Sequence, residues 1–155
     1  MATLDYKSIL SRFCTQAKAY KLATYPEDVV TELTNEWIHS MAGQVSVRRM
    51  FKSISLNDDI QQITFTLKNT VDEGSDIDFV SNIFSMGIGI RWCKAKLCDD
   101  NVLDQAFLSQ EVKFYSQKNH MDGLRDLLKD LKTELNSEIT QHNGTWNSYL
   151  KKGGK

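Results

Sequence analysis

The sequence predicts a single all-α domain. The chain has 155 residues, of which 41% are hydrophobic and 25% are charged, a size and balance that suit one globular domain with its own core. Pro26 is the only proline, and no repeat or low-complexity segment interrupts the chain. Apolar residues recur at helical spacing along most of its length. We therefore expect one helical domain over residues 1–150 and a disordered tail over residues 151–155.

The first part of the chain is predicted to form two helices. The first runs from Asp5 to Tyr20, and its apolar stripe consists of Tyr6, Ile9, Leu10, Phe13, Ala17 and Tyr20. Thr24-Tyr25-Pro26-Glu27 then has the pattern of a capping box, with proline in the first turn, where its missing N–H does no harm. Apolar residues continue at helical spacing as far as Ile54. We expect one long second helix, kinked near Ala42-Gly43.

The segment from Ile60 to Leu67 fits two structures. Ile63, Phe65 and Leu67 alternate with polar residues as in a strand, whereas Ile60, Ile63 and Leu67 also fit the spacing of a helix. A single strand would have no obvious partner. This favours a short helix.

The second half of the chain is predicted to be helical throughout. A short helix around Phe79–Phe84 should end at Met86-Gly87, because glycine suits the C-terminus of a helix. Two longer helices are expected over Ile90–Tyr115 and Met121–Thr140. Trp146, Tyr149 and Leu150 then form a terminal turn, which we expect to dock on the fold and hide its aromatic rings.

The composition restricts the classes of partner. With 19 basic and 20 acidic residues, the chain has no net field to attract nucleic acid or an anionic membrane. Its three cysteines lack the paired spacing of a disulfide framework or a zinc site. No segment has the apolar core of a signal peptide or the length of a membrane span. We expect a cytoplasmic protein without nucleic-acid binding or membrane insertion.

No motif of an enzyme or metal site appears in the sequence. Walker, dinucleotide-binding, nucleophile-elbow and HExxH patterns are missing, and His39, His120 and His142 lie far apart along the chain. The acidic residues near Asp99-Asp100 lack the glycine and terminal glutamate of a calcium loop. We expect a protein without enzymatic activity, metal or cofactor, which acts by binding another protein.

Three short segments occur in an informative order. In Ile139–Tyr149, a predicted helix ends at Asn143-Gly144 and a tryptophan and a tyrosine follow. Phe79–Gly87 is followed closely by Arg91-Trp92, and Val47–Ile54 contains an Arg-Arg-x-Phe stretch. In this order, the segments resemble the second homology region, the first homology region and the groove-wall helix of the B-cell-lymphoma-two (Bcl) family of apoptosis regulators.

The resemblance implies a fold and a function. The fold would be a bundle of about seven or eight helices around a central helix, with a hydrophobic groove on its surface. The groove would capture the amphipathic death-motif helix of a pro-apoptotic protein, so the protein would inhibit apoptosis. The short connection between the first two helices and the missing membrane tail are similar to compact viral pro-survival members, which would act in the host cell cytoplasm.

The resemblance also assigns a ligand site. The groove residues would be Val47, Arg48, Met50, Phe51, Ile54, Ile63, Phe79, Val80, Ile83 and Gly87. Arg91 or Lys94 would pair with an aspartate of the ligand, and the sequence does not decide between them. Phe51 would line the groove rather than the deepest core. The terminal motif would consist of Gly144, Trp146 and Tyr149, with Trp146 buried.

Two other functions stay open. A Bcl-fold inhibitor of innate immune signalling would share every feature above. A helical viral nucleocapsid or coat subunit has a similar size and would bind RNA phosphates through Arg48, Arg49 and Arg91, although the near-zero net charge favours the first function. The sequence also leaves open a homodimer, the preferred ligands and the source organism.

Overall fold

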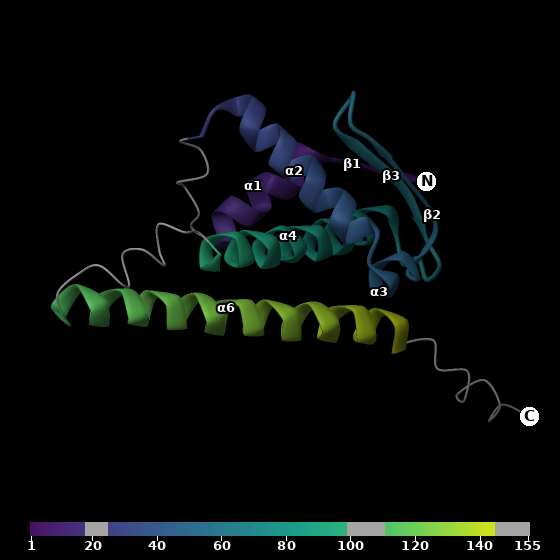
Figure 1. Cartoon of the computed structure of the whole chain (residues 1–155). Coiled ribbons are helices and arrows are strands. Elements are labelled where there is room, and N and C mark those ends of the chain that lie inside the picture. Colours follow the sequence, from purple (N-terminus) through teal and green to yellow (C-terminus); the bar gives the residue numbers. More distant parts are fainter. Residues whose placement is uncertain (18–24, 99–110, 145–155) are drawn as a thin grey trace, which may run out of the picture.

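The computed structural model describes residues 1–17, 25–98 and 111–144 (Figure 1). This part of the chain contains a three-stranded sheet and five helices. In chain order the elements are β1 (Ala2–Asp5), α1 (Tyr6–Ala17), α2 (Glu27–Ala42), α3 (Val45–Arg48), β2 (Phe51–Asn57), β3 (Gln62–Leu67), α4 (Glu73–Leu97) and α6 (Glu111–Gly144). Within these ranges, no helix combines the length and the apolar character that crossing a membrane requires.

The sheet shows that the expectation of an all-α bundle is wrong. β3 lies between β1 and β2, and both pairings are antiparallel (Figure 1). Ile63, Phe65 and Leu67 of β3 are buried and alternate with partly buried polar residues. The alternation in this segment therefore reflects a strand. Its partners come from residues 2–5 and from residues 51–57, where the sequence predicted no strand.

The predicted long second helix is also wrong. α2 ends at Ala42, α3 makes one further turn, and the chain then enters β2 at Phe51. By contrast, the first helix is confirmed over Tyr6–Ala17, with Tyr6, Ile9 and Phe13 buried, while its predicted end at Tyr20 lies outside the described residues. The helix predicted over residues 121–140 lies within α6. Trp146, Tyr149 and residues 151–155 lie outside the described residues.

α4 is one continuous helix, although the sequence predicted a helix end at Met86-Gly87. Asp72 caps its first turn, since its Oδ1 accepts a hydrogen bond from the backbone N–H of Ser75 at 2.9 Å. Gly87 lies where α2 crosses α4: a Cβ at this position would be 2.3 Å from Cγ of the buried Met41. The glycine is therefore explained by close packing of two helices rather than by a helix end.

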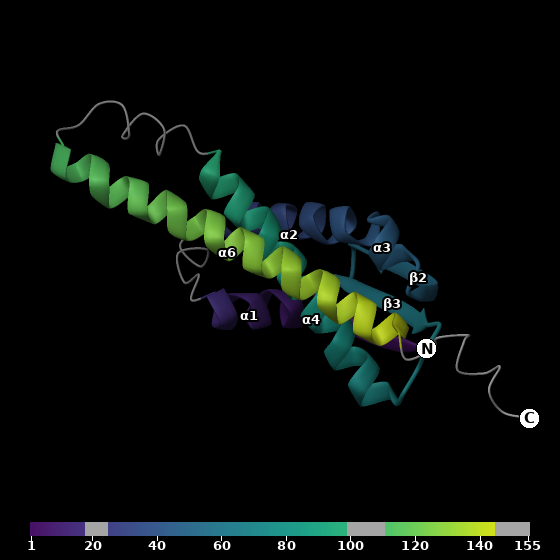
Figure 2. The same ribbon diagram turned by 90° about the horizontal axis from the view of Figure 1, so that it is seen from below.

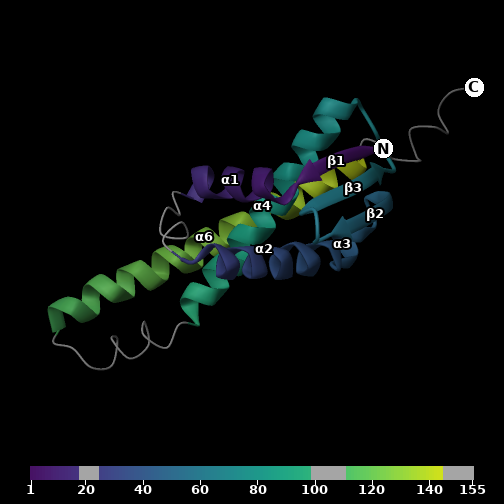
Figure 3. The same cartoon turned by 90° about the horizontal axis from the view of Figure 1, so that it is seen from above.

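α4 also forms the centre of the described fold. Its residues from Ile83 to Ile90 are buried without interruption, as expected for a helix that is covered on all sides. α1, α2 and α6 surround it (Figures 2 and 3). α6 packs Leu124, Leu135 and Ile139 into the interior, and its first turns extend beyond the end of α4. The sequence predicted a central helix, but not one in this position or one beside a sheet.

Candidate protein-interaction site

β2 forms one edge of the sheet, and residues 1–17, 25–98 and 111–144 contribute no strand on its outer side. We call this outer side, from Lys52 to Asn57, the β2 edge. Within the described part of the chain, the backbone hydrogen bonds of β2 join it to β3, and β3 is the one element with which β2 is in extensive contact. Alternate residues of an antiparallel strand direct their N–H and C=O groups away from the neighbouring strand. The β2 edge therefore presents backbone donors and acceptors that another strand could pair with.

A partly covered apolar row follows the β2 edge. Ile54 and Leu56 lie opposite buried residues of β3, so both face the core side of the sheet. Both are only partly buried, because the described part of the chain places no further strand beside them. Val45 and Ile60, which flank β2 in the chain, are 64% and 59% exposed. A strand added at this edge would cover the side chains of Ile54 and Leu56.

The start of β2 carries two features that proteins use to discourage strand pairing. The register with β3 shifts between Phe51 and Ser53, which marks a bulge, and Lys52 lies at this irregularity. Bulges and lysines both weaken an edge as a template for pairing. From Ser53 to Asn57, however, the register is regular and every side chain is uncharged. This five-residue segment remains suited to strand addition.

The opposite edge of the sheet, formed by β1, is less suited to strand addition. β1 has four residues, and its two apolar side chains, Ala2 and Leu4, are buried. Its Asp5 carboxylate already accepts a hydrogen bond from the side chain of Gln62 at 2.9 Å. The features that favour strand addition therefore occur together at β2.

The hairpin tip that follows β2 is fixed by hydrogen bonds. Asn57 Oδ1 accepts from the backbone N–H of Asp59 at 3.1 Å. Gln61 adopts a φ of 54°, in the left-handed region, and its carbonyl accepts from the backbone N–H of Tyr6 at 2.9 Å. These bonds tie the end of β2 to the start of α1. A strand held in this way loses little freedom when a partner binds.

Asp58 at the hairpin tip joins two further elements through what we call the Asp58 cluster. The hydroxyl of the buried Tyr6 donates to Asp58 Oδ1 at 2.8 Å, and Nε2 of His39 on α2 lies 3.0 Å from both carboxylate oxygens. Burial acts to raise the pKa of Asp58, but the hydrogen bonds from His39 and Tyr6 outweigh it and hold that pKa below its usual range. Burial, followed by the hydrogen bond to Asp58, raises the pKa of Tyr6.

Replacing Tyr6 by phenylalanine should destabilise the fold and weaken its sensitivity to alkali. Tyr6→Phe keeps the buried ring but loses the hydrogen bond, so we expect the free energy of unfolding to fall by about 1 kcal/mol at neutral pH. The pKa of Tyr6 is higher in the folded state than the unfolded value of about 10, so wild-type stability is lost as the pH rises above that value. The Tyr6→Phe variant should lose less stability than the wild type over the same pH range. Urea denaturation at neutral pH and at about pH 10.5 measures both effects, and equal alkaline losses in the two proteins would contradict the assignment.

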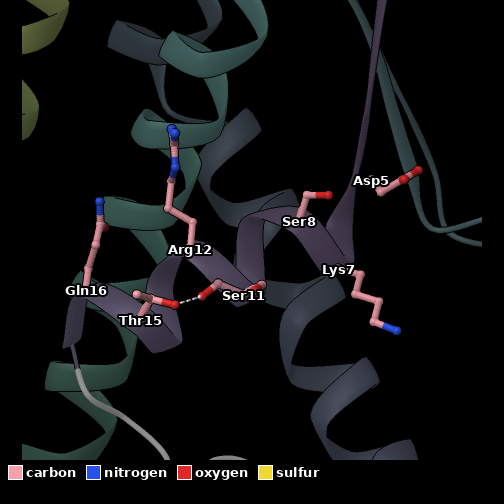
Figure 4. A pocket seen from close by; sticks show the side chains of 7 residues that line it. All are labelled: Asp5, Lys7, Ser8, Ser11, Arg12, Thr15 and Gln16. Carbon is pink, nitrogen blue, oxygen red and sulfur yellow. Dashed lines mark hydrogen bonds between the residues drawn. The ribbon is translucent and has the colours of Figure 1, made fainter.

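A second candidate is an open hollow of about 730 Å³ beside α1. It is lined by Asp5, Lys7, Ser8, Ser11, Arg12, Thr15 and Gln16 (Figure 4). Arg12 donates to the backbone carbonyl and the carboxylate of Asp78 at 2.8 and 3.1 Å, and Gln16 accepts from Ser85 at 2.8 Å. In Figure 4, Lys7 extends away from Arg12 and Gln16. Four of the lining side chains, those of Asp5, Arg12, Thr15 and Gln16, thus bond to other groups of the protein rather than converging on a common centre.

A third candidate is a small apolar pocket of about 60 Å³ where α1, α4 and α6 meet. Phe13 and Trp92 line it with their rings in an edge-to-face contact, 6.0 Å between centroids. Cys93 also lines it, and burial raises the pKa of its thiol, as burial does for Cys14 on α1. Both thiols are therefore protonated near neutral pH and are weak nucleophiles. The pocket has room for only a few water-sized groups.

The structure places most of the predicted groove residues in the core. Those with buried positions are Val47, Met50, Phe51, Ile63, Val80, Ile83 and Gly87. Ile54 is partly buried at the β2 edge, and Phe79 is partly buried on α4, where its ring stacks on His142 with 4.1 Å between centroids. Arg48 is exposed on α3. The predicted groove residues thus come from a helix turn, two strands and α4, and most of them have a packing role.

The two candidate partners for a ligand aspartate differ in their surroundings. Arg91 is partly buried, and its Nη2 donates to the hydroxyl of Ser40 on α2. Lys94, one turn further along α4, is exposed. Of the terminal motif, α6 is described as far as Gly144, while Trp146 and Tyr149 lie outside the described residues.

Comparisons with known proteins do not identify a family for this chain. The chain matches no family model, no curated protein and no solved structure. The Bcl resemblance therefore has the support of its short motifs alone, and the bundle that it implied is not the fold of the described residues.

Sequence reasoning did not identify the β2 edge, although a signal was present. Ile54 and Leu56 alternate with Ser53 and Ser55, and the turn-forming run Asn57-Asp58-Asp59 separates them from the alternating residues of β3. Two alternating runs joined by a few such residues are typical of a β-hairpin. Of the predicted site residues, Ile54 is the one that lies at this edge.

Proposed function

We propose that this protein is a protein-binding module that takes up an extended segment of its partner as an additional strand at the β2 edge. The observation that carries the proposal is the combination found there: one side of β2 whose backbone pairs with no other described strand, and a partly covered apolar row on the same strand. Recognition by strand addition uses these two elements. Backbone hydrogen bonds supply affinity, and alternate side chains supply specificity.

The expected ligand follows from the same features. It should be an extended segment that is uncharged where it pairs with Ser53–Asn57 and has apolar residues at alternate positions, so that two of them pack beside Ile54 and Leu56. Each new backbone hydrogen bond contributes about 0.5–1.5 kcal/mol, and covering a leucine adds about 1.5–3 kcal/mol when burial is complete. Since both side chains are already partly buried, we expect moderate affinity.

This proposal replaces helix capture in a groove. The apoptosis-inhibitor function depended on a helical bundle whose groove residues lie mainly in the core of this fold. The RNA-binding alternative depended on three arginines, of which Arg91 is partly buried and bonded to Ser40. Strand capture depends on residues that the described structure leaves accessible.

A peptide titration tests the proposal. A fluorescent peptide with the sequence of Phe51–Asn57 has the required alternation, and we expect it to bind the full-length protein saturably in fluorescence anisotropy. Leu56→Lys should weaken binding about tenfold or more, because a lysine replaces a leucine that the added strand would cover.

Leu127→Lys is the matched control, since Leu127 is 37% exposed on α6, which is not in extensive contact with β2. It makes the same chemical change away from the sheet and should leave affinity unchanged. Thermal unfolding of both variants establishes that they fold. Equal affinity losses in the two variants, or no saturable binding to wild type, would count against strand addition at β2.

A further inference from the structure

We infer that the strand taken up at the β2 edge is β2 of a second copy of this chain, so that two three-stranded sheets join into one six-stranded antiparallel sheet. This inference rests on the proposed function and names its partner. A pair of antiparallel β2 strands related by a two-fold axis perpendicular to the sheet is self-complementary only if the sequence matches its own reverse in one register. The sequence of β2 meets this condition.

The matching register places the axis at Ser55. Ser55 then lies opposite the partner's Ser55, and Ile54 lies opposite the partner's Leu56. Residues directly opposite each other in an antiparallel pair point to the same face, so apolar side chains meet on the core side of the sheet. Ser53 lies opposite the partner's Asn57 on the other face. Every contact along the regular segment is thus apolar with apolar or polar with polar.

Neighbouring symmetric registers are less favourable. An axis at Ile54 would place Lys52 opposite the partner's Leu56, and an axis at Leu56 would place Ile54 opposite the partner's Asp58. Each mismatch sets a charge against an apolar side chain. With the axis at Ser55, neither Lys52 nor Asp58 lies opposite an apolar side chain.

The limited overlap indicates how strong the association should be. The regular segment from Ser53 to Asn57 supplies five residues per copy, and the bulge at Lys52 ends the regular pairing. Such a contact is smaller than the standard interface of a permanent complex. We therefore expect a reversible dimer whose population rises with protein concentration.

Cysteine cross-linking of the full-length protein tests both the partner and the register. Ser55→Cys, in a background where the exposed Cys98 is replaced by serine, should form a disulfide-linked dimer under mild oxidation, because opposite residues have Cα atoms about 4.5–5.5 Å apart. Ser53→Cys in the same background is the control: its own counterpart would be displaced by about four residues, roughly 14 Å along the strand. Both serines are exposed, so neither change should disturb folding. We expect Ser55→Cys to yield about tenfold more covalent dimer, since only that pair meets disulfide geometry.

Sedimentation velocity of the wild type over a concentration series completes the test. Concentration-dependent dimerisation that Leu56→Lys suppresses and Leu127→Lys leaves unchanged supports the inference. A protein that stays monomeric but binds the β2 peptide overturns the self-association and leaves the proposed function standing. A protein that neither dimerises nor binds the peptide overturns both. Equal cross-linking of Ser53→Cys and Ser55→Cys overturns the register.

Discussion

Phe51→Ala should lower the free energy of unfolding by about 3–5 kcal/mol, the usual cost of truncating a buried aromatic residue. Phe51 is 5% exposed at the start of β2. Its ring meets that of Phe65 edge to face, with 5.9 Å between centroids and 76° between planes. The sequence placed this residue on the wall of a groove, where truncation would affect ligand binding more than folding. The structure places it in the core, so the substitution should mainly lower the stability of the fold.

Chemical denaturation of Phe51→Ala measures this loss. Ile54→Ala on the same strand is a suitable control. Because Ile54 is only partly buried, its truncation should lower the free energy of unfolding by less. A loss below about 1 kcal/mol for Phe51→Ala would mean that the ring is not packed as described.

Two glycines within helices should respond to alanine in opposite directions. Gly87→Ala would place a Cβ 2.3–2.5 Å from three side-chain atoms of Met41, which is itself fully buried. We expect this overpacking to cost about 1–3 kcal/mol, despite the better helix propensity of alanine. Gly123 on α6 has no heavy atom within 4 Å of the position that a Cβ would take. Gly123→Ala should therefore stabilise the protein by roughly 0.5–1 kcal/mol.

Thermal and urea unfolding of the two variants give the comparison directly. The helix-propensity gain is common to both, so the difference between them isolates the contact between Gly87 and Met41. If Gly87→Ala were as stable as Gly123→Ala, the close crossing of α2 over α4 would be refuted.

The helices that the sequence predicted correctly are those with a clear local stripe. Tyr6, Ile9 and Phe13 repeat at helical spacing in α1, and the leucines of α6 do the same from Leu124 onward. Such a stripe records burial of one face, and it lies within a single segment. The local sequence pattern was therefore sufficient to predict these two helices.

The pairing of β1 with β3 could not be predicted with the same means because it is long-range. β1 has four residues and pairs with β3 about 60 positions later, so nothing near either segment indicates the other. The other pairing, between β2 and β3, is a local hairpin, but its alternating runs also fit helical spacing. Phe51 and Ile54 continue the helical spacing of Val47 and Met50, so the predicted second helix extended to Ile54.

Gly87 is a second case in which a contact between distant parts of the chain decides the structure, here inside a helix. Locally, glycine disfavours a helix and suits its end. The close approach of Met41, about 46 positions earlier in the chain, is what requires a residue without a side chain there. Most of the residues assigned to the groove lie in the core for a related reason. A short apolar motif has the same sequence pattern whether its side chains line a surface groove or pack in the interior.

Amide hydrogen exchange followed by NMR would detect strand addition at the β2 edge residue by residue. The 155-residue chain would be measured alone and with excess β2 peptide, at a concentration at which sedimentation shows it to be monomeric. Within Ser53–Asn57, alternate amides point toward β3 and the others point outward. We expect the peptide to slow exchange at every second residue of this segment and to leave α1 and α6 unchanged. Unchanged exchange along β2, or protection that appears on another element instead, would contradict strand addition at this edge.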